Sequence, residues 1–203
     1  DCATYGFYLV SYFFPDTMEC FTTAEDVLIS YKKQVEHGTE RIEINRMQLS
    51  MLWQLMKMYK NPKLNLKKMP DISFSGEHGA DMGRPTKEFF HNAISSLTRM
   101  DPLFNIKLFG GKQGHLIPIC GVDAVASGCF EMAGKLVAHS ILHDGPGFIG
   151  LSPAVVNYLI TGSLEKAKES VSTHDLLDVE LKKLLDEDVC SFITNQLYGY
   201  TLI

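Results

Sequence analysis

The sequence predicts an α+β fold that is mainly helical and has a few short antiparallel strands. Helical patterns dominate the chain, whereas the runs that alternate polar and apolar residues are short. The chain has 203 residues, of which 45% are hydrophobic, and this suffices for one sizeable core or two small ones.

Each expected element is justified by its own local pattern. Residues 24–35 follow a threonine cap and carry two acids in the first turn, where the helix dipole favours them. Residues 122–143 are apolar on nearly all sides, which is typical of a buried helix. Helices are expected over residues 24–35, 47–60, 89–100, 122–143, 155–162 and 175–187. Residues 37–40, HGTE, are expected to break the first helix. Strands are expected over residues 41–46 and 71–75, and a hairpin over residues 104–119.

The helix expected over residues 47–60 is amphipathic and rich in methionine. Methionines on a helix face are typical of adaptable binding grooves, and they are also common in cores. We favour a core face for this helix. Its apolar face carries Met51, Leu52, Leu55, Met56 and Tyr59.

Composition and motifs exclude several classes of partner. The net charge is -5 and no stripe of Lys and Arg stands out, so no nucleic-acid partner is expected. The most apolar run, residues 5–14, is about half as long as a membrane span and lacks the features of a signal peptide, so no membrane partner is expected. Residues 110–114, GGKQG, do not fit the phosphate-loop pattern G-x-x-x-x-G-K-[ST]. They are expected to form a turn, and no cofactor is expected.

The five cysteines are scattered, and no two form a C-x-x-C pair. An odd number of scattered cysteines is typical of a reduced protein with buried thiols. We therefore expect an intracellular location, cytoplasmic or nuclear. The cysteines are Cys2, Cys20, Cys120, Cys129 and Cys190.

One candidate metal site involves two histidines of a predicted helix. His139 and His143 lie four residues apart, so both imidazoles fall on one helix face, as they do in many zinc sites. Ser140 stands where the motif H-E-x-x-H requires a glutamate. We therefore expect packing and polar contacts at a helix end from these histidines, and no metal.

A group of acids and histidines surrounds residues 76–90, GEHGADMGRPTKEFF. A general acid–base pair can be drawn from this group. Carboxylates near a helix start are also stabilised by the helix dipole, and no nucleophile with an obvious base lies nearby. We therefore expect no catalytic residue here. The group comprises Glu77, His78, Asp81, Glu88 and His91.

Residues 72–90, ISFSGEHGADMGRPTKEFF, resemble the amino-terminal lobe of HECT-type E3 ubiquitin ligases. In that family a strand ends in F-x-G-E-x-G-x-D-x-G-G and is followed by [TS]-[RK]-E-F-F. Arg84 departs from the pattern, because the family usually has a second glycine there. The matching residues are Phe74, Gly76, Glu77, Gly79, Asp81, Gly83, Lys87, Glu88, Phe89 and Phe90.

Three further segments agree with the same family in order and spacing. Residues 41–46, RIEINR, resemble its opening strand, which typically ends in an arginine pair. Residues 129–148 resemble a buried helix of the family, and residues 152–163 followed by 172–185 resemble the segments after it. The whole resemblance covers roughly residues 41–188. In the buried helix the matching positions are Phe130, Gly134, Lys135, Ala138 and Ile141.

The resemblance implies scaffold roles for the motif residues. The glycines let the chain turn sharply out of a strand, with positive φ at one or more of them. Asp81 or Thr86 is expected to cap the next helix, and the two phenylalanines to anchor it in the core. The two glutamates are expected to bond backbone amides or to pair with Lys or Arg. These scaffold residues are Gly76, Glu77, Gly79, Asp81, Gly83, Glu88, Phe89, Phe90 and Gly134.

The family's chemistry requires a cysteine that this chain does not supply. In HECT ligases ubiquitin passes to a cysteine of the carboxy-terminal lobe, in a motif like L-P-x-[AS]-x-T-C-x-x-x-[LF]. Cys190 lacks the preceding Thr and Pro, and Cys129 lies in a buried helix pattern, where a thiol is inert. None of the five cysteines inherits the role, so the chain is expected to be catalytically silent on its own.

The chain begins at Asp1 rather than Met and ends without a polar tail, so we expect a fragment truncated before the carboxy-terminal lobe. Residues 1–40 are expected to be an amino-terminal extension, and residues 41–203 a partial N-lobe-like domain. Four apolar side chains near the end either pack locally within this fold or contact a partner or missing chain, as an unpaired apolar patch often does. These are Phe192, Leu197, Tyr198 and Tyr200.

We therefore expect an N-lobe scaffold that supports ubiquitin transfer from a conjugating enzyme to a substrate. The implied partners are that enzyme, ubiquitin and the carboxy-terminal lobe of the same chain. One alternative is a catalytically dead HECT-like protein that serves as an interaction module. A second alternative is a small metal-dependent hydrolase that uses His139 and His143.

Overall fold

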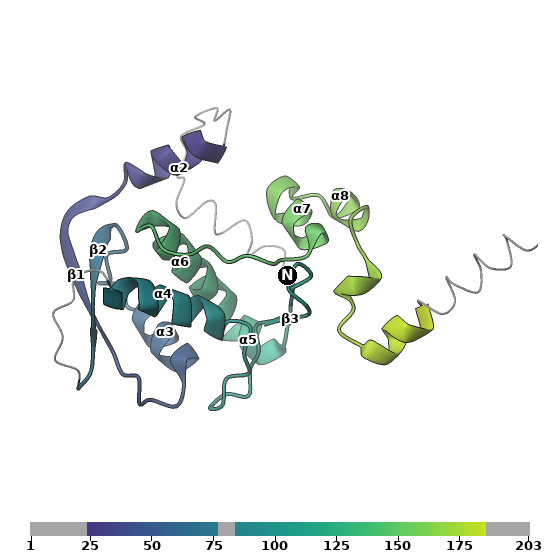
Figure 1. Cartoon of the computed structure of the whole chain (residues 1–203), viewed down its shortest axis with the longest axis horizontal. Coiled ribbons are helices and arrows are strands. Elements are labelled where there is room, and N and C mark those ends of the chain that lie inside the picture. The colour runs from purple at the N-terminus through teal and green to yellow at the C-terminus, as the bar shows by residue number, and fades with distance from the viewer. Residues whose placement is uncertain (1–23, 77–83, 186–203) are drawn as a thin grey trace, which may run out of the picture. The chain divides into compact units, whose positions relative to one another are not determined.

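The computed structural model describes residues 24–76 and 84–185 and has an α+β fold (Figure 1). Helices outnumber strands in this part of the chain, as predicted. None of the helices described is both long enough and apolar enough to cross a bilayer.

The chain divides into two compact units, each of which is described by itself. Unit 1 comprises the residues up to Phe109 together with Ile119–Phe148. Unit 2 comprises Gly110–Pro118 and the residues from Ile149 onward.

Unit 1 is built on a parallel pair of strands. β1 (Glu36–Ile44) pairs with β2 (Lys68–Phe74), and α3 (Met51–Tyr59) lies between them in the sequence. Two short strands were predicted here, but the antiparallel arrangement is wrong for this pair. The connection through α3 brings the chain back to the end of the sheet at which β1 starts, so β2 runs in the same direction as β1.

The first strand begins earlier than predicted, because it includes residues 37–40, which were expected only to separate it from the preceding helix. Gly38 has a φ of +103°, and the register of the pair shifts between Glu36 and Thr39. The strand therefore absorbs the glycine as a local irregularity instead of ending there. It also crosses the boundary expected at residue 40.

Besides α3, the described residues of unit 1 form four helices. α2 (Ala24–Lys32) precedes β1, and α4 (Arg84–Ser96) follows β2. A single helix was predicted over residues 122–143, but Gly128 adopts φ +75° and divides it into α5 (Val122–Ala126) and α6 (Cys129–Leu142).

Helices α3, α4 and α6 pack against one another, and α4 also packs on β2 (Figure 1). The resulting core combines both strands with the inner faces of these helices. A core of this kind is stabilised mainly by removal of apolar surface from water. Its fully buried side chains include Leu55, Phe89, Phe90, Ala93 and Leu136.

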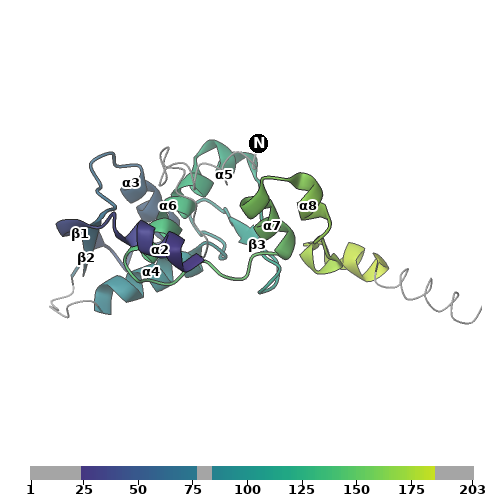
Figure 2. The ribbon, with the colours of Figure 1, turned by 90° about the horizontal axis from the view of Figure 1, so that it is seen from above.

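Unit 2 is smaller. α7 (Pro153–Thr161) packs against α8 (Leu164–Lys168), and a 3-10 turn spans Thr173–Asp175 (Figure 2). Ser152 caps α7 and Gly162 ends it with a φ of +62°, as the sequence indicated.

The predicted hairpin takes the form of two very short strands. β3 (Phe109–Gly110) pairs with β4 (Ile117–Pro118). Between them Gly111 and Gly114 both have positive φ, so the run GGKQG forms a turn.

Candidate binding site

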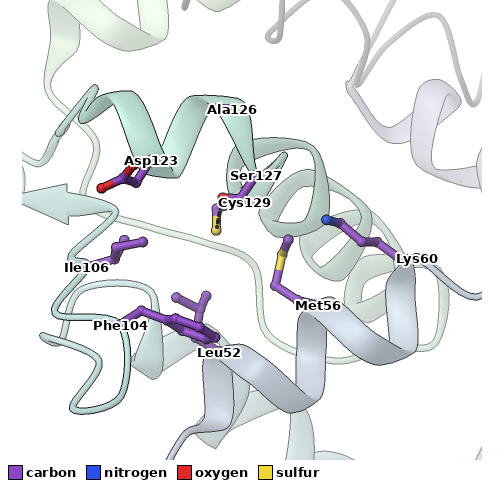
Figure 3. A pocket seen from close by; sticks show the side chains of 9 residues that line it. All are labelled: Leu52, Met56, Lys60, Phe104, Ile106, Asp123, Ala126, Ser127 and Cys129. Atoms are coloured by element: carbon purple, nitrogen blue, oxygen red, sulfur yellow. Dashed lines mark hydrogen bonds between the residues drawn. The ribbon is translucent and has the colours of Figure 1, made fainter.

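Unit 1 contains an open, mostly apolar pocket of about 530 Å³ (Figure 3). One wall comes from α3, a second from the loop at residues 101–106, and a third from α5 and the start of α6. Lys60 and Asp123 add one positive and one negative side chain to the lining. The pocket is lined by Leu52, Met56, Lys60, Phe104, Ile106, Asp123, Ala126, Ser127 and Cys129.

Helix α3 serves both the core and the pocket. Ser50 caps it by accepting the amide hydrogen of Trp53 at 2.9 Å. Leu55 and Tyr59 are buried in the core, as predicted for this face. Met56 is only partly buried and lines the pocket, so the same helix packs in the core and contributes one wall of the pocket.

The loop that carries Phe104 is held by a buried carboxylate. The Asp101 Oδ1 atom accepts the amide hydrogens of Leu103 and Phe104, at 3.0 and 3.1 Å. Its other oxygen, Oδ2, accepts the hydroxyl hydrogen of Ser50 at 2.7 Å. The cap of α3 therefore also fixes the opposite wall of the pocket, a link between distant segments that the sequence analysis missed.

The Cys129 thiol lies in the pocket lining and is 3% exposed. Its sulfur lies 3.1 Å from the hydroxyl oxygen of Ser127 (Figure 3). The break at Gly128 sets the thiol at the first residue of α6. Cys129 is a free cysteine, whereas Cys120 is disulfide-bonded, so the expectation that all cysteines are reduced is wrong.

Most of the described scaffold residues lie where the sequence predicted. Gly76 has a φ of +83°, as expected for the turn out of β2. Phe89 and Phe90 are fully buried, and their ring centroids lie 5.3 Å apart. Gly134 is buried inside α6. Four further scaffold residues, Glu77, Gly79, Asp81 and Gly83, lie outside the described residues.

The capping prediction for α4 is wrong for Thr86. The helix already begins at Arg84, so Thr86 lies in its first turn. Its hydroxyl donates to the carbonyl oxygen of Pro70 at 3.2 Å and thereby joins α4 to β2. The other predicted cap, Asp81, lies outside the described residues.

Glu88 pairs with arginine, as predicted. A guanidinium nitrogen of Arg46 lies 2.8 Å from a carboxylate oxygen of Glu88, and both side chains are partly exposed. The same guanidinium lies 3.7 Å from the centroid of the Phe74 ring. His91, one turn after Glu88, is exposed. The remaining acid–base candidates, Glu77, His78 and Asp81, lie outside the described residues.

His139 and His143 lie in the interior and are held by contacts within the protein. Nδ1 of His139 lies 3.0 Å from the Tyr59 hydroxyl, and Nε2 of His143 lies 2.9 Å from the carbonyl oxygen of Leu66. The two rings meet edge to face, with centroids 5.1 Å apart. Within the described part of the chain, no cluster of three or more Cys, His, Asp or Glu side chains could hold a metal ion.

Burial makes both imidazoles weak bases. Desolvation, with a smaller effect from the charge of His143, lowers the pKa of His139 to about 3. Burial also lowers the pKa of His143. Of the described buried side-chain atoms, Nε2 of His139 lacks a hydrogen-bond partner. A neutral ring suits this position, because a charged ring would place an unpaired charge in the core.

The partner-binding residues proposed near the end of the chain, Phe192, Leu197, Tyr198 and Tyr200, lie outside the described residues. Comparison of the chain with protein-family models, with curated proteins and with solved structures gives no match.

Proposed function

We propose that this chain is the amino-terminal-lobe scaffold of a HECT-type ubiquitin ligase. The observation that carries the proposal is the contact of Arg46 with Phe74 and Glu88. These residues come from three segments that the resemblance singled out separately: the opening strand, the glycine-rich strand end and the K-E-F-F helix. Through these contacts Arg46 connects the three segments to one another.

The positions of the motif residues in the fold support the interpretation of this chain as a scaffold. Phe89 and Phe90 fix α4 in the core, and Gly76 turns the chain at the end of β2. Cys129 is almost completely buried, which suits a structural thiol better than one that receives ubiquitin. The thioester cysteine therefore belongs to another part of the enzyme, and this chain is silent by itself.

In this proposal the partners are a ubiquitin-conjugating enzyme, ubiquitin and the carboxy-terminal lobe, and the setting is intracellular. The disulfide at Cys120 does not suit a reducing compartment.

The catalytically dead interaction module is the second candidate, and one observation favours it. The apolar pocket of unit 1 is open and includes Phe104, which is 45% exposed. Open apolar surface of this kind is typical of protein contact sites. A module of this kind would need the pocket and no reactive cysteine.

The two candidates differ in whether ubiquitin becomes covalently attached. The natural gene product that contains these residues should be incubated with a panel of ubiquitin-charged conjugating enzymes. The ligase proposal predicts a ubiquitin adduct that a thiol reductant removes. Absence of any adduct, with binding of the conjugating enzyme retained, contradicts the ligase and favours the module.

A further inference from the structure

A basic segment stands out in this acidic chain. Residues 44–70 contain six Lys and Arg side chains and no Asp or Glu, although the whole chain has a net charge of -5. Five of the six are lysines between the last turn of α3 and the start of β2. We call residues 57–68 the lysine loop; its lysines are Lys57, Lys60, Lys63, Lys67 and Lys68.

The lysine loop is held in a defined shape by two asparagines. The side-chain oxygen of Asn61 accepts the amide hydrogen of Lys63 at 3.0 Å, and that of Asn65 accepts the amide hydrogen of Lys67, also at 3.0 Å. Such turns fix the backbone between the two elements. The lysines are therefore presented from an ordered loop, which lowers the entropy cost of binding a partner.

These lysines are not neutralised by the described part of the protein. Other lysines form ion pairs, such as Lys135 with Glu131 at 2.7 Å and Lys32 with Asp144. Within the described residues none of the five loop lysines does so. The Lys57 ammonium lies 5.2 Å from the centroid of the Trp53 ring. The carboxylate of Glu36 contacts the loop by accepting a hydrogen bond from the side-chain amide of Asn65 at 2.9 Å.

The loop and the pocket share Lys60. Lys60 is the C-cap residue of α3. Its side chain also lines the pocket, beside Met56 and opposite Asp123 (Figure 3). A positive surface thus continues into an apolar hollow, whose far side carries a negative charge. We propose that the two together bind an acidic segment of another protein, which inserts a large apolar side chain into the pocket.

The combination favours a peptide segment over the other classes of polyanion. RNA or an anionic membrane would use the lysines but would leave the apolar pocket without an anchor. Asp123 would repel a phosphate chain that continued past Lys60, whereas a peptide can present a neutral or basic residue there. The proposal is independent of the proposed ligase function, because it needs only the charges and the pocket.

The test is a selection from a random peptide library displayed on phage, with the 203-residue protein as bait. The expected winners carry a run of Asp or Glu beside Leu, Phe, Met or Trp. A fluorescent peptide with glutamates followed by leucine and phenylalanine is then titrated and read by anisotropy. The triple variant Lys60→Glu, Lys63→Glu, Lys67→Glu should bind about tenfold or more weakly, since three attractive contacts become repulsive.

Two further proteins complete the test. Phe104→Ala should weaken binding several-fold by removing apolar contact area. The triple variant Lys33→Glu, Lys166→Glu, Lys183→Glu has the same net charge but lies outside the loop, and it should bind within about twofold of the parent protein. Circular dichroism verifies that each variant is folded.

Three results would overturn the proposal. The first is selection of basic or uncharged peptides. The second is equal peptide binding by the parent protein and the folded loop variant. The third is that the protein binds polyuridine RNA or phosphatidylserine vesicles more tightly than the peptide, and that the loop variant no longer binds them. That result would assign the lysines to another class of partner.

Discussion

The guanidinium of Arg46 stacks 3.7 Å from the centroid of the Phe74 ring and so joins the ends of the two parallel strands. Arg46 follows β1, Phe74 closes β2, and the pairing of Arg46 with Glu88 adds α4 to the same cluster. The end of β1, the end of β2 and helix α4 are therefore tied together at one point.

This cluster predicts a modest but specific loss of stability in Arg46 variants. Arg46→Ala removes the stacking and the ion pair and should lower the free energy of unfolding by about 1–2 kcal/mol. Arg46→Lys retains the charge but not the flat stacking surface, so about half of that loss is expected. Urea denaturation measures both. Lys168→Ala, which breaks an exposed pair with Glu165, is the control and should change little.

The aromatic pair of α4 predicts a much larger effect. Phe90 is completely buried, with 0% of its surface accessible. Phe90→Ala should therefore lower the free energy of unfolding by about 3–5 kcal/mol, through lost apolar burial and the cavity left behind. Phe104→Ala removes an identical ring that is 45% exposed and should cost far less. Similar denaturation midpoints for the two variants would contradict the assigned core.

The turn after α6 predicts that Gly145 tolerates no side chain. A Cβ atom there would lie 2.4 Å from the hydroxyl oxygen of Ser140 and 3.1 Å from a ring carbon of Phe90. Gly145→Ala should therefore destabilise the protein by about 1–3 kcal/mol. Gly147→Ala meets no atom within 4 Å and should be neutral or slightly stabilising. Thermal unfolding of the pair gives the comparison.

The buried imidazole of His139 predicts loss of stability in acid. Its folded-state pKa is about 3, below the ordinary value of 6.5, so the unfolded chain binds a proton at a higher pH than the folded chain does. The free energy of unfolding should thus fall as the pH drops from about 6.5 towards 3, by up to about 1.4 kcal/mol per pH unit from this group. Urea denaturation at several pH values measures the slope.

A pair of variants isolates that effect from the carboxylates, which also titrate in acid. His139→Phe cannot bind a proton, so its stability should depend less on pH than that of the parent protein. Tyr59→Phe removes the hydroxyl that contacts His139 but keeps the buried imidazole, so the slope should persist. An unchanged slope in His139→Phe would show that this imidazole is not responsible.

Local pattern was enough to predict most elements, because caps and apolar periodicity act within a few residues. Ser152 and Gly162 bound α7 as expected, and Phe89 and Phe90 are buried as expected. The parallel pairing of β1 and β2 was not predicted, since alternation within a strand carries no information about the direction of its neighbour. The early start of β1 could not be predicted for a similar reason: strand pairing accommodates Gly38, whose local tendency is to interrupt regular structure.

The pocket could not be predicted, because its walls come from segments far apart in the sequence. Asp101 holds the Phe104 loop against the cap of α3 through Ser50, a contact across 51 positions that no local pattern reports. The lysine loop is present in the sequence, but the negative net charge of the whole chain conceals this local excess of positive charge.

The position of the ubiquitin thioester tests the central claim most directly. The natural gene product is charged with ubiquitin, and the modified cysteine is located by mass spectrometry, with the 203-residue chain treated in parallel. The scaffold account predicts that the short chain forms no thioester and that the long product carries one on a cysteine that is none of Cys2, Cys20, Cys120, Cys129 and Cys190. A reducible adduct on any of these five cysteines would contradict it.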